Sequence, residues 1–148
     1  MVIIKYGSIF DSETEALVNP VNCVGVMGKG LALEFKKRYP LNFQAYEEAC
    51  NSQRVKIGSM FVTTGHSWPS IVNFPTKRHW RNPSRMEDII KGLEALRRHI
   101  WDTNLTKISM PAVGCGLGGL RFDEVRPEIL YSLEDLDCEV SLYPPGCG

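Results

Sequence analysis

Two glycine-rich segments limit what this chain can fold into, because each stands between a short apolar run and a helical pattern. The segment "PAVGCGLGGL" (111–120) follows "KISM" (107–110), and "GVMGKG" (25–30) follows "EALVNPVN" (15–22). Glycine weakens regular structure, so its concentration predicts tight bends or a close approach of the backbone to another group. A strand, a glycine loop and a helix in succession are typical of a parallel sheet.

Strand-like and helical segments also alternate along the rest of the chain. Runs rich in β-branched and aromatic residues predict further strands at 2–6, 59–64, 70–74 and 138–143. Helical patterns are expected at 31–39, 42–50 and 122–136, and a loop is expected at 75–83. The alternation predicts an α/β fold with a mixed, mostly parallel sheet that helices cover on both faces.

The helix after residue 83 has the clearest pattern. Ser84 and Glu87 form an S-x-x-E sequence, which is typical of a capping box at a helix start. Apolar residues at spacings of four, three and four predict a buried stripe along this helix: Ile89, Leu93, Leu96 and Ile100. In the helix at 122–136, Pro127 is expected in the first turn, because proline lacks the N–H that later turns use.

The chain is long enough for one domain, which we assign to residues 1–143, with a tail at 144–148. Seventeen basic and seventeen acidic residues cancel, so a contact with nucleic acid needs a local patch. No signal peptide or membrane span is expected, since no run approaches roughly 18 apolar residues. Five cysteines without a C-x-x-C pair favour reduced thiols in the cytoplasm over disulfides or a zinc site. We expect no metal and no cofactor.

Both glycine loops are expected at the carboxyl ends of strands, where open α/β sheets bind ligands. Gly114, Gly116 and Gly119 fit G-x-G-x-x-G, but the chain ends too soon after Gly119 for the rest of a dinucleotide-binding domain. Backbone N–H groups at a helix start bind phosphate oxygens, so the two loops together predict a ligand with two linked phosphates. The alternative is that one or both loops are only tight turns.

Asn19 and Asn22 follow "ALV" at a predicted strand end. Their amides need hydrogen-bond partners, and a ribose supplies hydroxyl groups. The alternative is that both asparagines cap local turns, which suits Asn19 better than Asn22.

Taken together, these segments resemble the macrodomain, a three-layer α/β/α fold that binds ADP-ribose. "ALVNPVN" is similar to the strand and asparagine motif of that family, "GVMGKGLA" to its first loop, and "PAVGCGLGGL" to its diphosphate loop. Within the family, "NCVGVMGKGLALEFKKRYP", "NFPTKRHWRNPSRMEDI" and "GCGLGGLRFDEV" most resemble the DNA ADP-ribosyl glycohydrolase antitoxins. Those enzymes remove ADP-ribose from thymine bases that a partner toxin has modified, and they are related to the terminal ADP-ribose protein glycohydrolase.

The resemblance implies Lys77, in "PTKRHWR", as the catalytic residue. Its amine could stabilise charge as the bond from the distal ribose to the base breaks, or attack the opened sugar as a nucleophile, and the sequence does not choose. The alternative is a solvated surface lysine. The resemblance further implies ADP-ribose contacts from the strand ends and both loops: Ser8, Ile9, Asn19, Asn22, Val26, Met27, Gly28, Lys29, Gly30, Thr76, Pro111, Val113, Gly114, Cys115, Gly116, Leu117, Gly118 and Gly119.

Two positions depart from the family pattern. Many macrodomains have an aspartate that contacts adenine where this chain has Ser8, so adenine recognition is expected to use the backbone at Ile9 and apolar walls. The protein glycohydrolase has an acid–base aspartate where this chain has Gly118, which weakens the case for cleavage of protein-linked ADP-ribose. The antitoxin branch commonly carries a second, C-terminal domain, so we expect a minimal form or an isolated domain.

The segment "KRHWR" interleaves cations with an aromatic ring, which suits single-stranded nucleic acid. Trp80 would stack on a base while Lys77, Arg78 and Arg81 contact phosphates, and His79 belongs to the same predicted nucleic-acid surface. The alternative is a solvated loop with the tryptophan packed inward. His79 as a proton carrier and Cys115 as a nucleophile are less favoured than structural roles. His66 and His99 show no ligand spacing, and a positive His99 would suit a helix C-terminus.

The favoured function is therefore an ADP-ribosyl glycohydrolase acting on single-stranded, ADP-ribosylated DNA. The expected partner is a DNA ADP-ribosyltransferase toxin, and the expected form is a cytoplasmic monomer without membrane contact. A non-catalytic reader of ADP-ribose, a hydrolase of protein ADP-ribosylation and a hydrolase of ADP-ribose 1″-phosphate remain open as alternatives.

Overall fold

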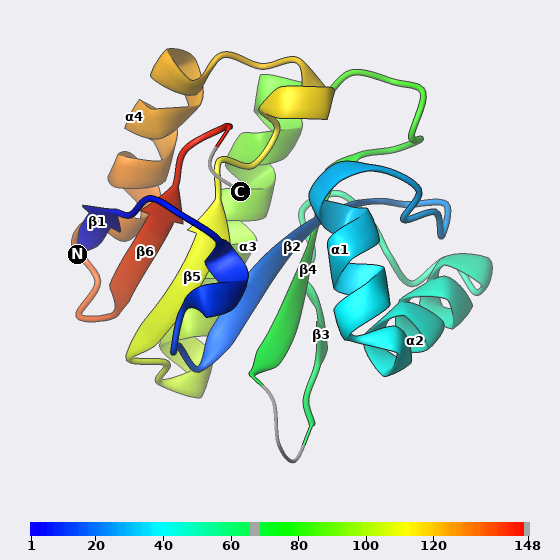
Figure 1. Cartoon of the computed structure of the whole chain (residues 1–148). Helices are drawn as coiled ribbons and strands as arrows, with labels where there is room; N and C mark the ends of the chain where they lie inside the picture. The colour runs from blue at the N-terminus through cyan, green and yellow to red at the C-terminus, as the bar shows by residue number, and fades with distance from the viewer. Residues whose placement is uncertain (66–68, 147–148) are drawn as a thin grey trace.

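The strand-like runs of the sequence form one six-stranded sheet in a computed structural model that describes residues 1–65 and 69–146 (Figure 1). The strands are β1 (Val2–Ile4), β2 (Ala16–Asn22), β3 (Phe61–Thr63), β4 (Ser70–Lys77), β5 (Lys107–Pro111) and β6 (Glu139–Tyr143). Their order across the sheet is β1-β6-β5-β2-β4-β3, and every neighbouring pair is parallel except β3 with β4. The predicted mixed, mostly parallel sheet is confirmed.

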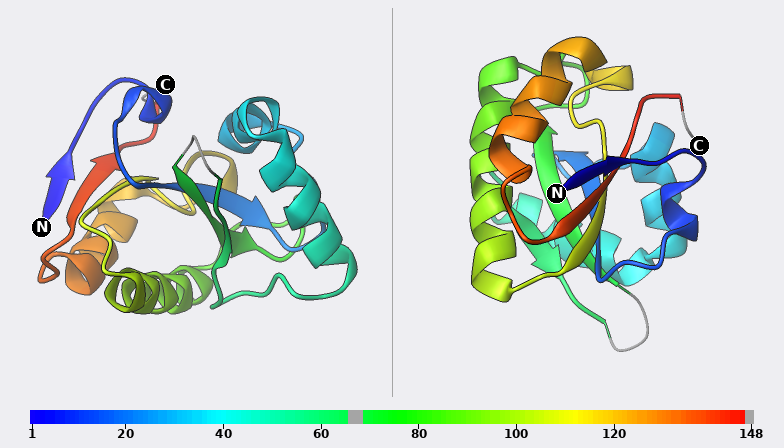
Figure 2. Two further views of the ribbon diagram at one scale, coloured as in Figure 1. Left: turned by 90° about the horizontal axis from the view of Figure 1, so that it is seen from below. Right: turned by 90° about the vertical axis from the view of Figure 1, so that its left-hand side faces the viewer.

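Helices cover both faces of the sheet, as Figure 2 shows. One layer holds α1 (Gly30–Arg38), α2 (Pro40–Asn51) and the short 3-10 helix η1 (Ile9–Asp11). The other holds α3 (Met86–Thr103) and α4 (Phe122–Leu133). A second 3-10 helix, η2 (Gly116–Gly118), lies in the second glycine segment. This is the three-layer α/β/α arrangement predicted from the sequence.

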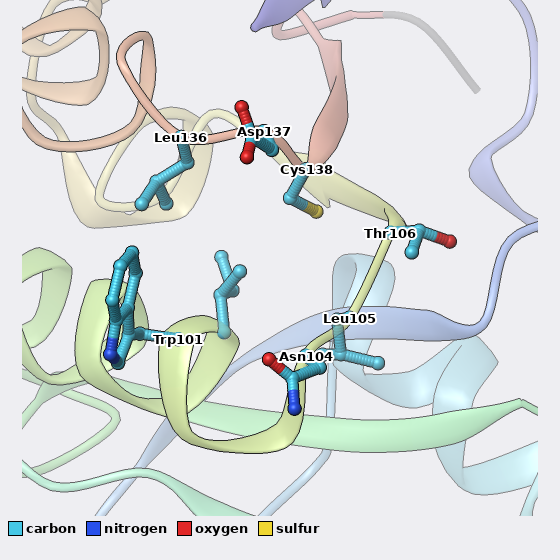
Figure 3. Close-up of a pocket in the computed structure, with 8 residues that line it drawn as sticks. Trp101, Asn104, Leu105, Thr106, Leu136, Asp137 and Cys138 are labelled. Atoms are coloured by element: carbon cyan, nitrogen blue, oxygen red, sulfur yellow. The ribbon is translucent and has the colours of Figure 1, made fainter.

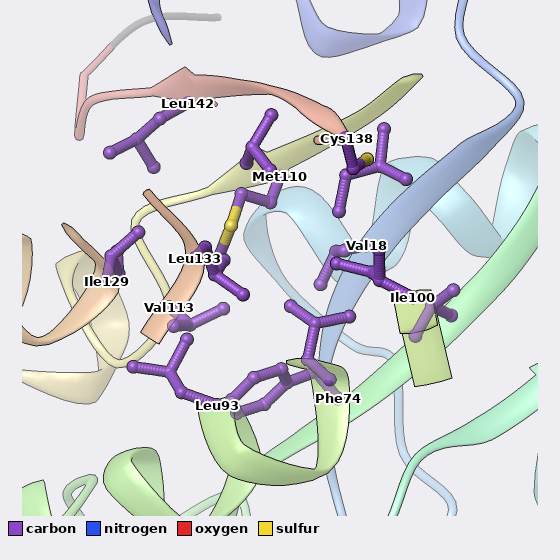
Figure 4. Close-up of a cluster of buried hydrophobic side chains, with 14 of the residues drawn as sticks. Val18, Phe74, Leu93, Ile100, Met110, Val113, Ile129, Leu133, Cys138 and Leu142 are labelled. Atoms are coloured by element: carbon purple, nitrogen blue, oxygen red, sulfur yellow. The ribbon is translucent and has the colours of Figure 1, made fainter. Parts of the chain in front are cut away.

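The largest apolar core lies between the sheet and the α3–α4 layer (Figure 4). The predicted stripe of α3 faces into it, and all four of its residues are at most 3% exposed: Ile89, Leu93, Leu96 and Ile100. Two smaller clusters fill the other face, one beneath α2 around Tyr46 and one around Phe35 of α1. Strands β2, β4, β5 and β6 are mostly buried, as is typical of parallel sheets, whereas the outer strands β1 and β3 are partly exposed.

The prediction of a loop at 75–83 is wrong at its first three residues, because β4 continues to Lys77. Pro75 cannot donate to a sheet ladder, and it is tolerated here because β3 pairs with β4 only at residues 71–73, leaving that side of Pro75 unpaired. The strand therefore carries Thr76 and Lys77 to the edge of the sheet.

Three further local predictions are wrong. Ser84 does not cap α3, which begins at Met86 with Arg85 in the cap position and no side-chain cap; the backbone of Ser84 bonds elsewhere. Pro127 is the sixth residue of α4 rather than part of its first turn, which leaves the carbonyl of exposed Asp123 without its usual donor.

Burial lowers the pKa of His99, against the opposing effect of Asp102, so this histidine favours its neutral form.

Several sequence predictions fall partly outside the described residues. The expected turn "GHSWP" includes residues 66–68, among them His66, and the expected tail includes residues 147–148. These five residues lie outside the part of the chain that the structure describes. Among residues 1–65 and 69–146, no helix is both long and apolar enough to cross a bilayer. Cys23, Cys50, Cys115 and Cys138 are unbonded thiols.

Gly92 provides a test of packing between α3 and the sheet. A Cβ at this position would overlap the ring of the fully buried Phe74. Alanine normally stabilises a helix relative to glycine by about 1 kcal/mol. Here we expect Gly92→Ala to lower the free energy of unfolding by about 1–3 kcal/mol, because the buried ring has no room to move.

Urea denaturation measures this change. The variant Phe74→Leu removes the ring edge, so Gly92→Ala should cost markedly less in the Phe74→Leu background than in the wild type. Equal costs in the two backgrounds would contradict the steric explanation.

Candidate functional site

Three neighbouring parallel strands end at one edge of the sheet, which lies at the top of Figure 1. β2 leads into the first glycine loop (residues 23–30), β5 leads into the second glycine loop (residues 112–120), and β4 ends at Lys77. The expectation that both loops lie at carboxyl ends of strands is confirmed. The sheet thus brings together segments that are far apart in the sequence.

Asn22 holds the first glycine loop in shape. Its Nδ2 donates to the Val26 carbonyl (2.8 Å), and its Oδ1 accepts from the N–H groups of Val24 (3.0 Å) and Val26 (3.4 Å). The Tyr46 hydroxyl lies 2.8 Å from both the carbonyl and Oδ1 of Asn22 and donates to them. Burial raises the pKa of Tyr46, so the donor stays protonated. These bonds match the turn-capping alternative for Asn22.

Asn19 lies below the loop, inside the sheet, with its side chain fully buried. Its Nδ2 donates to Asn73 Oδ1 (3.1 Å) and lies 3.8 Å from the sulfur of Met27. Asn73 in turn exchanges hydrogen bonds with Asn42 of α2. Asn19 therefore supports the floor of the first glycine loop and does not reach the open edge of the sheet.

The second glycine loop turns through short main-chain hydrogen bonds. Cys115 N–H donates to the Ala112 carbonyl (3.1 Å), and Leu120 N–H donates to the Gly114 carbonyl (3.0 Å). Gly114 has φ +82°, and a Cβ there would lie 2.9 Å from Leu120 Cδ1, so only glycine fits. Within the described residues, the N–H groups of Gly116 and Leu117 at the start of η2 have no acceptor. They remain available to an anion.

The two loops meet each other. A Cβ on Gly30 would lie 3.2 Å from the Leu117 side chain, so the start of α1 and the tip of the second loop are in contact. Gly30 is the first residue of α1, whose first N–H groups lack helical partners. The open edge therefore has two helix starts side by side, one from each loop.

Ser84 forms a buried support beneath the second glycine loop. Its N–H donates to the Gly118 carbonyl (2.8 Å), and its hydroxyl is buried without a hydrogen-bond partner among the described residues. A Cβ on Gly118 would lie 2.5 Å from the Ser84 oxygen. A side chain at position 118 would therefore have to displace the buried Ser84 hydroxyl.

Lys77 reaches from the end of β4 toward the second glycine loop. Its Nζ donates to the carbonyls of Trp80 and Leu117, each at 3.4 Å. The register of β2 with β4 shifts here, since Val21 pairs with Pro75 and Asn22 with Lys77, which leaves Thr76 as a bulge. Bulges redirect side chains at the ends of strands. Lys77 is partly exposed, and both of its carbonyl contacts lie at the surface, so the alternative of a solvated surface lysine stays open.

The segment after Lys77 is divided between two environments. Arg78 turns its guanidinium to the buried carboxylate of Asp88 (3.1 Å), although more than half of its side chain is exposed. Trp80 is 46% exposed, so the alternative of a tryptophan packed inward is wrong. Arg81 lies over the Trp80 ring at 4.7 Å, and His79 Nδ1 accepts from the Arg81 N–H (3.1 Å). His79 therefore shapes the loop locally.

The adenine-side predictions fall on η1. The Ser8 hydroxyl accepts from Phe10 N–H (3.2 Å) as the cap of this helix, and Ile9 is 4% exposed. Ile9 packs in the same cluster as Tyr143 of β6. The Ser8 side chain thus has a local structural role, and the Ile9 side chain forms part of the apolar core.

The predicted site residues divide by exposure into an open rim and a buried base. The exposed members are Val26, Gly28, Lys29, Gly30, Gly116, Leu117, Gly119, Arg78, Trp80 and Arg81. Partly exposed are Ser8, Lys77, His79, Pro111 and Cys115. Buried are Ile9, Asn19, Asn22, Met27, Thr76, Val113, Gly114 and Gly118. Burial also raises the pKa of Cys115 to about 11, so its sulfur is a thiol at neutral pH and a poor nucleophile.

Sequence reasoning missed the residues that support the site from behind. These are Tyr46, Asn42, Asn73, Ser84 and Asp88, all of them buried. Each lies on a helix, a strand or a loop outside the glycine motifs, and no local spacing links it to them. Only the polar character of residues in apolar surroundings could have drawn attention to them.

A separate depression lies at the opposite, amino-terminal edge of the sheet (Figure 3). It is lined by the end of α3 and the segments that precede β5 and β6, including Trp101, Leu105 and Leu136. Ligands of open α/β sheets bind beyond the carboxyl ends of strands, so we place the candidate site at the glycine loops. Within the described residues, no three His, Cys, Asp or Glu side chains cluster as metal ligands would.

The Tyr46–Asn22 contact can be tested without a ligand. Tyr46→Phe removes the hydroxyl and leaves two buried acceptors of Asn22 without that donor. We expect the free energy of unfolding to fall by about 1–2 kcal/mol. Because Asn22 also holds the loop, the N–H groups of Val24 and Val26 should exchange faster with deuterium.

Tyr143→Phe is the matched control, since Tyr143 is also buried but belongs to a different cluster. It should leave exchange at Val24 and Val26 unchanged. Unaltered exchange in Tyr46→Phe would show that the hydroxyl does not support the loop.

Comparison with known proteins agrees with this architecture. A DNA ADP-ribosyl glycohydrolase of Mycobacterium tuberculosis is 48% identical over 99% of this chain, and the chain spans only 43% of that relative's length. The solved macrodomain of Mycobacterium tuberculosis DarG superposes with a TM-score of 0.95 at 46% identity, covering 99% of both chains. Thermosipho africanus DarTG in complex with ADP-ribose superposes with a TM-score of 0.93 at 31% identity, covering 98% of this chain and 42% of that one.

The family model described as "Macro domain" matches residues 18–129, which include both glycine loops, Lys77 and the supporting helix α3. The match spans most of the chain, and it extends over the sheet edge at which the geometry places the site. This chain therefore belongs to the macro domain family.

Proposed function

We propose that this chain is an ADP-ribosyl glycohydrolase that removes ADP-ribose from thymine bases of DNA. The observation that carries the proposal is the position of Lys77, whose Nζ lies between the Trp80 and Leu117 carbonyls where the second glycine loop meets the end of β4. A protein that only binds ADP-ribose has no need of an amine at this point. The names of the similar proteins support the same activity.

The two glycine loops provide the binding half of the reaction. Free N–H groups at Gly116 and Leu117, and those at the start of α1, would hold the two phosphates of ADP-ribose. The contact between Gly30 and Leu117 keeps the two sets of donors at a fixed separation. With the pyrophosphate held there, the distal ribose would lie toward Lys77.

Hydrolysis breaks the bond between C1″ of the distal ribose and the thymine nitrogen, adding hydroxyl to C1″ and a proton to the base. Within the described residues, Lys77 has carbonyl partners and no carboxylate partner. Its ammonium charge is thus not neutralised by an ion pair and can stabilise the departing base. As a neutral amine it could attack the opened sugar instead, with water later releasing the product.

Trp80 would contact the modified base and its neighbours in the strand. Its indole is exposed beside Lys77, and Arg81 lies over the ring. A base that stacks on Trp80 would displace the guanidinium or extend the stack. A thymine that carries ADP-ribose on its pairing edge cannot stay paired, so the substrate would be single-stranded or extruded.

A partner that makes this substrate would be a DNA ADP-ribosyltransferase. A relative from Thermosipho africanus, 31% identical over 94% of this chain, is named as a fusion of a DNA ADP-ribosyl transferase with a DNA ADP-ribosyl glycohydrolase. Cleavage of protein-linked ADP-ribose has less support, because Gly118 supplies no carboxylate and a side chain there would have to displace the buried Ser84 hydroxyl.

The substitution Lys77→Ala tests the catalytic assignment. Turnover of an oligonucleotide with one ADP-ribosylated thymine should fall at least about 100-fold, since the group that meets the reacting atoms is lost. The dissociation constant for ADP-ribose, measured by calorimetry, should change less than about 3-fold. Unchanged turnover would remove Lys77 from the mechanism.

Lys77→Arg separates the two roles of the amine. Arginine keeps the charge and cannot form an imine. Partial activity in Lys77→Arg would favour the electrostatic role, whereas a wild-type adduct trapped by borohydride would favour the covalent one. A wild-type protein that binds ADP-ribose but cleaves neither DNA-linked, protein-linked nor 1″-phosphate substrates would instead be a reader.

The substitution Trp80→Ala tests recognition of DNA. Loss of base stacking should raise KM for the modified oligonucleotide about 5- to 150-fold, corresponding to roughly 1–3 kcal/mol, with a smaller effect on kcat. Affinity for free ADP-ribose should be unaffected. Trp101→Ala is the matched control, because Trp101 is an exposed tryptophan on α3 outside the site. Equal KM values for Trp80→Ala and the wild type would contradict stacking.

A further inference from the structure

Asp88 is the only charged side chain of the described residues that is fully buried, at 1% exposure. It is the third residue of α3, where the helix dipole favours negative charge. Its Oδ1 accepts from the Arg78 guanidinium at 3.1 Å. A buried carboxylate is costly unless it is paired, so the placement of Arg78 is tightly constrained by Asp88.

Arg78 is also bonded through its backbone. Its carbonyl accepts from the N–H of Cys23 (3.4 Å), the first residue of the first glycine loop. The residue before it, Lys77, pairs with Asn22 just beyond the bulge at Thr76. One residue thus connects the start of α3, the first glycine loop and the end of β4.

Lys77 is the last residue of β4, and the chain bends at Arg78 directly after it. The Arg78 side chain points to α3, and the Lys77 side chain reaches the carbonyl of Trp80 and that of Leu117 in the second glycine loop. The ion pair with Asp88 therefore restrains the residue directly after Lys77. The bulge at Thr76 interrupts the regular ladder, so the ion pair adds a constraint to the pairing of Lys77 with Asn22 and to the bond between Cys23 and Arg78.

We propose that Asp88 is a positioning residue, which acts through Arg78 to aim the amine of Lys77 at the reacting sugar. The inference rests on the proposed function and deepens it. It assigns Arg78 to the support of Lys77, in place of the sequence-based prediction that Arg78 contacts nucleic acid. A catalytic group displaced by about 1 Å can lose about 100-fold in rate, so a small rotation at Lys77 is enough to matter.

The two roles of Arg78 differ in their dependence on substrate. A contact to a DNA phosphate matters only when flanking phosphates are present. A positioning role matters equally for ADP-ribosylated thymidine, the nucleoside without neighbouring nucleotides. Turnover of this nucleoside and of the modified oligonucleotide should therefore be measured side by side for Arg78→Ala, Arg78→Lys and Asp88→Asn.

We expect Asp88→Asn and Arg78→Ala to lower kcat about 10- to 100-fold on both substrates, with the affinity for free ADP-ribose unchanged within about 3-fold. Arg78→Lys retains an ion pair and should recover most of the activity. Asp135→Asn is the matched control, since it makes the same change in an exposed ion pair between Arg97 of α3 and Asp135, just beyond the end of α4, and should leave kcat unchanged.

Loss of activity on the oligonucleotide alone would overturn the proposal and identify Arg78 as a DNA contact. Wild-type kcat in Asp88→Asn on both substrates would overturn it as well. Should either single variant fail to fold because it leaves a buried charge or an unfilled space, the double variant Arg78→Met with Asp88→Asn removes both charges together. Wild-type kcat in the folded double variant would equally overturn the proposal.

A second readout does not require turnover. The Lys77 amine should react faster with an acetylating reagent when its direction is no longer fixed. Asp88→Asn should therefore raise the rate of Lys77 acetylation several-fold, as measured by mass spectrometry, whereas Asp135→Asn should leave that rate unchanged. An unchanged rate would overturn the positioning role even if no substrate were cleaved. Failure of the proposed function would appear separately, as a wild-type protein that cleaves neither thymidine substrate.

Discussion

The parallel pairing of β2 with β4 on one side and β5 on the other is the constraint on which the site depends. Parallel strands end at the same edge, so this pairing alone brings together the first glycine loop, the second glycine loop and Lys77. None of these segments is adjacent to another in the sequence. The contact of Gly30 with Leu117 and the bonds of Lys77 Nζ to the second loop follow from that shared edge.

Buried polar groups then give the flexible loops a defined shape. Asn22 satisfies three main-chain groups of the first loop and is itself held by Tyr46, while the amides of Asn19, Asn42 and Asn73 bond to one another beneath it. Such networks are costly to bury unless nearly every group is paired. The exceptions among the described residues are Asn19 Oδ1 and Ser84 Oγ, and both lie directly under the glycine loops. Among the buried side-chain nitrogen and oxygen atoms of the described residues, those without a hydrogen bond therefore lie beneath the two loops.

The oxygen atoms that contact Lys77 belong to carbonyl groups, and this matters for the chemistry of the site. Carbonyl oxygens contact its Nζ, and the buried carboxylate of Asp88 is paired with Arg78. In the second glycine loop, a side chain at position 118 would have to displace the buried Ser84 hydroxyl. A lysine that works without an adjacent carboxylate suits a leaving group that is stable as an anion, such as a thymine, better than one that needs strong acid assistance.

The sequence by itself determined the α/β class, the mostly parallel sheet, the buried stripe of α3 and the location of the glycine loops. These depend on local periodicity and on glycine, which act over a few residues. It also pointed to Lys77 through a resemblance carried by consecutive residues, and to Trp80 through the interleaving of cations with an aromatic ring. It could not show that β4 continues through Pro75 or that Ser84 lies under Gly118 instead of capping α3, because both follow from neighbours distant in the chain. Only the tertiary structure decided which polar residues support the site, since Tyr46, Asn73 and Asp88 acquire their roles from burial and pairing across elements.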